Sequence, residues 1–226
     1  MINEQKIIDK IKKLLELASS PNENEAKSAM KMAQKLMIQF NLDDVKIGTH
    51  HAVVEPILQQ EYWNDIINRS GVIEVMPRIV DTIGPIFGVF GLYQIKRRSG
   101  TIQGIKLNGF KSNLEITRFA LDSLLAQGLA DYRIEFKKYK SAMFGLEFWS
   151  GFGIGIERKF KSFGSKSDNS ALVIYDRVLE RVKSLANSSF QIQTFNGNAI
   201  QSGIDAGLRA EIRKGLTQTN QGKLIS

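Results

Sequence analysis

Residues 87–107, FGVFGLYQIKRRSGTIQGIKL, carry the clearest strand signal in the chain. Aromatic and β-branched residues, which favour strands, fill both ends of this stretch, and its centre, Arg97-Arg98-Ser99-Gly100, has the composition of a turn. The pattern predicts a β-hairpin between residues 86 and 107. Ser112 and Glu115 stand in capping-box spacing just beyond it, so we expect a long helix to begin there.

Helical patterning precedes the hairpin. Apolar residues recur at helical spacing over the first forty residues, and Pro21 interrupts them. Asn22 and Glu25 form another capping-box pair, which predicts two helices joined by a short turn. We expect the helices to bury Ile7, Ile8, Ile11, Leu14, Leu15 and Ala18 on the first and Ala26, Ala29, Met30, Ala33, Leu36, Met37 and Phe40 on the second.

The connection between these helices and the hairpin is expected to be irregular. Residues 43–61 have a loop-like composition, with a short strand at 52–58. Short helices are predicted at 62–67 and 75–83, the second broken by Pro77.

One glycine pattern occurs twice in the last third of the chain. Gly151 and Gly155 are four residues apart, and Gly203 and Gly207 repeat their surroundings fifty-two residues later. Glycine inside a helix costs about 1 kcal/mol relative to alanine, so two such pairs call for a reason. We expect two helices packed at close range; the alternative is a backbone that approaches a ligand. An amphipathic helix is also predicted at residues 171–185.

These patterns predict a helix-dominated α+β fold, with an N-terminal helical hairpin and a small antiparallel sheet packed with C-terminal helices. We expect the helical hairpin to occupy residues 1–45, an α+β domain residues 60–216, and a polar tail residues 217–226.

The first forty residues also resemble a known family. They contain KIKKLLELA at residues 10–18, SPNE at 20–23, EA at 25–26 and AQKLM at 33–37. This combination resembles the family called domain of unknown function 2786, which occurs in bacterial and phage proteins. Asn24 stands where that family has a histidine, so any role of that histidine is absent or moved in this chain. The resemblance implies no mechanism, because the family has no established activity.

The positive charge of the chain is concentrated in its middle third. Lys and Arg outnumber Asp and Glu by 31 to 23 over 226 residues, which gives a net charge of +8. Residues 96–166 hold fourteen of the basic and six of the acidic residues, so this segment accounts for the whole excess. It is interpreted either as a phosphate-binding surface or as a solvated lysine-rich surface.

The sequence contains no recognisable catalytic or metal-binding motif. The chain has no cysteine, and its two histidines are the adjacent His50 and His51, so we expect neither a metal site nor thiol chemistry. No phosphate-binding loop, dinucleotide-binding glycine pattern or hydrolase nucleophile elbow occurs. We therefore expect no catalytic residue and no cofactor, although an enzyme that uses Glu, Lys or Tyr would leave no such signature. No apolar run has the length of a membrane span, and the expected location is the cytoplasm of a bacterial or infected host cell.

The charge pattern favours a non-enzymatic nucleic-acid-associated accessory protein of phage or bacterial type, which binds the phosphate backbone of DNA or RNA. The candidate phosphate-binding residues are Arg97, Arg98, Lys137, Lys138, Lys140, Arg158, Lys159 and Lys161. Aromatic residues interleave with these cations and are candidates for base stacking, namely Phe110, Tyr132, Phe136, Tyr139, Phe160 and Phe163. One alternative is a phage interaction protein that binds a host defence protein or a nucleotide signal, and another is an enzyme without a recognisable motif.

Overall fold

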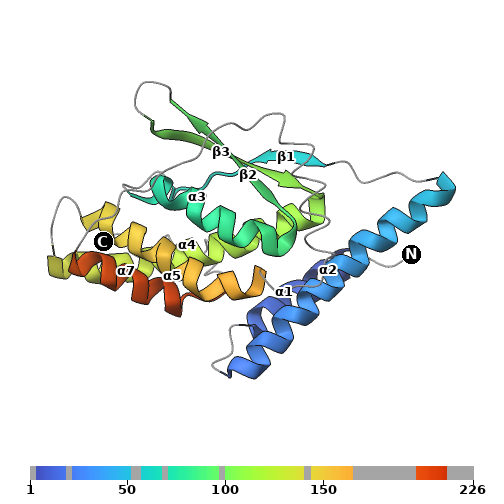
Figure 1. Cartoon of the computed structure of the whole chain (residues 1–226), viewed down its shortest axis with the longest axis horizontal. Helices are drawn as coiled ribbons and strands as arrows, with labels where there is room; N and C mark the ends of the chain where they lie inside the picture. The colour runs from blue at the N-terminus through green and yellow to red at the C-terminus, as the bar shows by residue number, and fades with distance from the viewer. Residues whose placement is uncertain are drawn as a thin grey trace, which may run out of the picture.

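The computed structural model describes residues 4–18, 22–51, 57–67, 71–96, 100–139, 144–164 and 197–212. Helices dominate it, and a three-stranded antiparallel sheet lies on one side of the helical layer (Figure 1). This arrangement confirms the predicted α+β class. The predicted helix at 171–185 and the polar tail at 217–226 lie outside the described residues, and the predicted division into domains stays a prediction.

The N-terminal helical hairpin is confirmed. Helix α1 spans Glu4–Leu17 and helix α2 spans Glu23–His51. Both helices contribute to one continuous core cluster, and the residues that they bury in it are Ile8, Ile11 and Leu15 on α1 and Met30, Ala33 and Met37 on α2. The spacing of the apolar residues therefore identified the packed faces of both helices.

The loop predicted from residue 43 is wrong as far as His51, because α2 continues without interruption to that residue. Asp43 and Asp44 have low helix propensity, but the penalty is below about 1 kcal/mol per residue. No proline follows before Pro56, so nothing in this stretch forces the helix to end.

Asn22 caps α2 as its sequence position predicts. Its Oδ1 accepts hydrogen bonds from the backbone N–H groups of Asn24 at 3.1 Å and Glu25 at 3.4 Å. We expect Asn22→Ala to lower the free energy of unfolding by about 1 kcal/mol, because two amide groups lose their acceptor. Asn22→Asp retains the acceptor and should unfold at the wild-type urea concentration; equal midpoints for Asn22→Ala and wild type would show that the cap contributes nothing.

The sheet has the strand order β1-β3-β2. Strands β2 (Phe90–Ile95) and β3 (Ile102–Gly109) form the hairpin that the sequence predicts, with Tyr93 opposite Ile105. Strand β1 (Leu58–Glu61) pairs antiparallel with the other edge of β3, which places Glu61 opposite Lys106. The strand was predicted to end at residue 58, and the observed strand ends three residues later, at Glu61. Residues 52–56 lie outside the described part of the chain.

Of the two short helices predicted between β1 and β2, the one at 75–83 is observed without its predicted break, and the one at 62–67 is wrong. Residues 62–67 are not helical, because the chain after β1 stays against the sheet, with the N–H of Tyr62 bonded to the carbonyl of Ile105 at 2.8 Å. Helix α3 spans Val72–Ile83 and contains Pro77 without a break, then continues into a 3₁₀ turn, η1, at Gly84–Phe87. Burial of Pro77 and its apolar neighbours in the core outweighs the single helical hydrogen bond that the proline cannot donate.

Helix α4 spans Lys111–Tyr139 and begins before the predicted cap at Ser112, so the second capping box is wrong. Glu115 instead bonds the ammonium group of Lys12 at 2.7 Å, and that ammonium group also lies 5.8 Å from the centre of the Phe119 ring. These contacts join α1 to α4 and hold the helical hairpin against the rest of the molecule.

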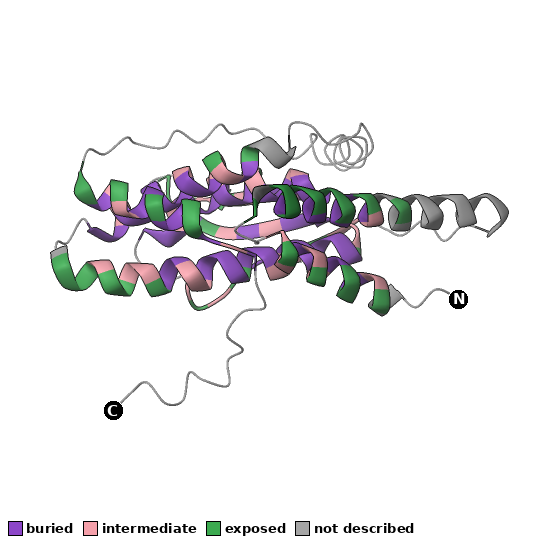
Figure 2. Ribbon diagram, turned by 90° about the horizontal axis from the view of Figure 1, so that it is seen from below, coloured by how far each residue is buried: buried purple, intermediate pink, exposed green. Residues whose placement is uncertain are grey.

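Helix α5 (Phe144–Gly164) and helix α7 (Asn198–Arg209) pack in parallel through the two glycine pairs, which confirms the predicted close crossing. A Cβ on Gly151 would overlap the carbonyl oxygen of Ile200, and a Cβ on Gly203 would overlap that of Phe148. Gly203 lies fifty-two residues after Gly151, and Phe148 lies fifty-two residues before Ile200, so the two contacts are equivalent with the helices exchanged. A local two-fold axis therefore relates the helices. Figure 2 shows the buried faces of the helices turned toward each other.

Candidate nucleic-acid interface

The basic end of α4 is exposed at the tip of the helical layer. The side chains of Lys137 and Lys138 both face solvent, and Lys138 forms an ion pair with Glu135 at 2.6 Å. Lys137 has no ion-pair partner among the residues that the structure describes. Lys140 lies outside the described residues.

The cations of α5 lie farther along the molecule. Helix α5 runs antiparallel to α4, with Phe144 beside Tyr132 and Phe136, so Arg158 lies about 25 Å along the helix axis from the end of α4. Lys159 donates a hydrogen bond to the carbonyl of Ala210 at 2.6 Å, at the C-terminal end of α7. Lys161 lies 3.6 Å from the carboxylate of Glu157. Two of these three cations therefore have partners within the protein.

Arg97 and Arg98 lie outside the described residues, but the residues on either side of them are described. The N–H of Gly100 bonds to the carbonyl of Lys96 at 2.9 Å, and the N–H of Lys96 bonds to the carbonyl of Thr101 at the same distance. Lys96 and Gly100, the described residues on either side of the two arginines, thus lie at the free end of β2 and β3. Figure 1 shows this end of the hairpin and the basic end of α4 at the same end of the long axis, while α5 runs away from it.

Three of the six aromatic residues proposed to stack on bases pack within the fold. Phe160 is buried in the core, and Tyr132 packs at 5.6 Å from the rings of both Phe144 and Phe148. Phe136 is partly exposed but stacks on Tyr132 at 5.6 Å. Phe110 is half-buried, and the side chains of Tyr139 and Phe163 lie outside the described ones. Helix packing therefore accounts for Tyr132, Phe136 and Phe160.

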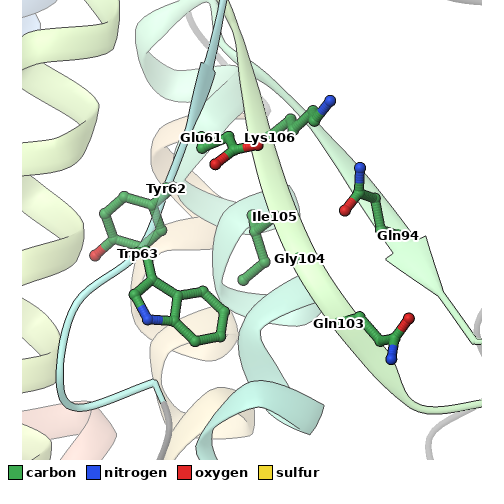
Figure 3. A pocket seen from close by; sticks show the side chains of 8 residues that line it. All are labelled: Glu61, Tyr62, Trp63, Gln94, Gln103, Gly104, Ile105 and Lys106. Carbon is green, nitrogen blue, oxygen red and sulfur yellow. The ribbon is translucent and has the colours of Figure 1, made fainter.

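An exposed tryptophan that the charge pattern does not indicate lies on the sheet. Trp63 follows β1 and borders a pocket of about 250 Å³, whose other lining residues are Glu61, Tyr62, Gln94, Gln103, Gly104, Ile105 and Lys106. In Figure 3 the indole lies on one side of β3 at the level of Gly104, and the two glutamine side chains lie on the other. The described helices lie behind the sheet in this view, so the pocket opens on the face that they leave uncovered.

The residues on either side of Trp63 are fixed to the body of the protein. Tyr62 is buried and donates a hydrogen bond to the carboxylate of Asp122 on α4 at 2.8 Å. Burial raises the pKa of the Tyr62 phenol well above its usual value, and the charge of Asp122 raises it further, so the phenol remains a donor. Asn64 donates to the same carboxylate at 3.0 Å and accepts the N–H of Ile66 at 3.0 Å. Trp63 is therefore held between two anchored residues.

The sequence did not indicate this site because residues 62–67 were interpreted as a helix, in which Trp63 would belong to an amphipathic face. The available signal was Asn64-Asp65 directly after a strand, a pair that favours turns. A turn at that point ends the buried run and leaves the preceding indole at the surface.

Two further properties of the described residues bear on the site. They contain no group of three or more His, Asp or Glu side chains arranged to hold a metal ion. None of the described helices combines the length and the apolar character needed to cross a membrane.

Comparison with known proteins confirms the resemblance of the N-terminal region. A family model described as "Protein of unknown function (DUF2786)" matches residues 6–44, which correspond to α1 and the greater part of α2. No curated protein and no solved structure matches the chain. The matched region does not include the sheet, the pocket at Trp63 or the basic central segment.

Proposed function

We propose that this chain is a non-enzymatic nucleic-acid-associated accessory protein of phage or bacterial type that contacts the phosphate backbone of DNA or RNA through its basic central segment. The observation that supports the proposal most directly is the position of Lys96 and Gly100, the described residues on either side of Arg97 and Arg98. They lie at the free end of the hairpin, at the same end of the molecule as the basic end of α4. Two short basic segments separated in the sequence are thereby available to one extended polyanion.

The positions of the cations suggest which of them contribute most to phosphate binding. Lys96, Arg97 and Arg98 are consecutive in the sequence, and Lys96 is exposed. Arg158 is exposed too, but only a strand that runs along the molecule for about 25 Å would reach it as well as the end of α4. Lys159 contributes to the packing of α7, so we assign it the smallest part in binding.

Binding should weaken steeply with salt, because each phosphate contact releases condensed counterions. Three or four contacts give a slope of about −3 in a plot of log K against log salt concentration. We expect the double variant Arg97→Glu/Arg98→Glu to flatten this slope by the contribution of about two phosphate contacts. Fluorescence anisotropy of labelled single-stranded and duplex DNA and RNA, titrated at several salt concentrations, measures it.

The matched control is Arg158→Glu/Lys161→Glu, which reverses the same number of charges away from the hairpin. It should change the slope by less than the hairpin variant. No binding of any of the four nucleic acids at tens of micromolar protein, near the weak end of nonspecific affinities, would contradict the proposed function. That result would favour the interaction protein that binds a host protein or a nucleotide signal.

A further inference from the structure

We propose that the pocket at Trp63 is a stacking site for one unpaired nucleobase, so that the protein prefers single-stranded nucleic acid to duplex. This inference rests on the proposed function and identifies the class of nucleic acid that the protein recognises. Trp63, Gly104 and the amide groups of Gln94 and Gln103 carry it.

The exposure of Trp63 calls for a reason. Its side chain is 44% exposed, although burial of a large aromatic residue normally stabilises a fold. Within the described part of the chain the indole makes neither a ring contact nor a hydrogen bond. Because Tyr62 and Asn64 are both bonded to Asp122, the backbone that carries the indole is fixed to α4 before any ligand arrives. A backbone that is already ordered loses little conformational entropy on binding.

The floor of the pocket is backbone. Gly104 lies in β3, and a Cβ at this position would meet the Oε1 atom of Gln94 at 2.7 Å. The Gln94 side chain occupies the space over Gly104 that a Cβ would need, so the absence of a side chain on Gly104 lets the Gln94 amide lie over β3 at the edge of the pocket. The amide groups of Gln94 and Gln103 both donate and accept hydrogen bonds, as the edge of a base does.

The charges of the pocket suit a base rather than a phosphate. Glu61 and Lys106 face each other across the β1–β3 pair and balance each other. Lys96 is exposed and available for phosphate contact, and it lies two residues beyond Gln94, or roughly 7 Å along the strand. A single strand can place a base in the pocket and its phosphates near Lys96. A duplex cannot, because its bases are stacked and paired.

The test compares oligothymidylate with an abasic strand that carries the same number of phosphates. We expect the wild-type protein to bind oligothymidylate about 5- to 150-fold more tightly, the range for stacking of one base. Trp63→Ala should reduce this ratio to about 1, and Trp63→Phe should keep most of it. Gly104→Val should also abolish the ratio, because it fills the pocket while Trp63 stays in place.

A second measurement needs no fluorescent label on the oligonucleotide. Trp63 and the fully buried Trp149 are the two tryptophans of the chain, so oligothymidylate should quench the fluorescence of Trp63, with Trp63→Phe as the baseline. The control variant is Met32→Ala, which removes an exposed apolar side chain from α2 and should leave the ratio unchanged.

The outcomes separate the two proposals. Equal binding of both strands by the wild-type protein, or an unchanged ratio in Trp63→Ala and Gly104→Val, would overturn the stacking site and leave the proposed function standing. Failure of the wild-type protein to bind either strand would overturn the stacking site, and the proposed function would fall with it only if duplex DNA and RNA also fail to bind.

Discussion

Gly203→Leu is expected to destabilise the protein by at least about 3 kcal/mol, the upper end of the usual range for overpacking. The first atom of the new side chain would overlap the carbonyl oxygen of Phe148 and lie 2.8 Å from the backbone nitrogen of Phe152. Both atoms belong to the backbone of α5, so no rotation of a side chain relieves the clash and the two helices must separate. For a chain of this length the melting temperature should fall by roughly 6 °C or more.

Gly153→Ala provides the matched control for this prediction. Gly153 lies on α5 as well, but its nearest neighbours are side-chain atoms of Val75 and Arg78 on α3 and not backbone atoms of a neighbouring helix. The loss should therefore be clearly smaller than for Gly203→Leu. If Gly203→Leu melts at the wild-type temperature, α7 does not pack on α5 through its glycines.

Leu15→Ala should lower the free energy of unfolding by roughly 2–5 kcal/mol, measured by urea titration. Leu15 is fully buried between the two N-terminal helices and the remainder of the core, so truncation leaves a cavity. The comparison is Leu17→Ala on the same helix, where the side chain is 51% exposed and its loss should change stability by less than about 0.5 kcal/mol. Equal effects of the two substitutions would show that α1 does not pack as described.

The parts of the fold that the sequence predicted correctly are those set by local periodicity. The heptad-like spacing around Leu15 and Met30, the strand pair on either side of the basic turn and the two glycine pairs each define one packed face. The errors lie where a weak local preference met tertiary packing. Pro77 stays inside α3 because its surroundings are buried, and Ser112 does not cap α4 because the helix begins one residue earlier.

Less of the candidate interface than of the fold could be predicted from the sequence. A count of charges identifies a basic segment, but it does not show that Lys159 bonds to Ala210 or that Arg158 lies far from Lys137. The pocket at Trp63 requires β1 to pair with a strand more than forty residues later, through Glu61 and Lys106. No periodicity reports a contact over that separation.

The two-fold relation between α5 and α7 has a consequence for how the chain folds. Because the helices are parallel, the end of α5 and the start of α7 lie at opposite ends of the pair, about 30 Å apart. Formation of the pair must therefore meet the entropy cost of bringing together residues about fifty positions apart in the sequence, such as Gly151 and Ile200, before any contact is gained. A glycine-lined crossing offers close contact only when both pairs are in register, since a shift by one residue brings side chains against backbone. We expect α7 to dock late and in a single register, with no partly docked arrangement of comparable stability.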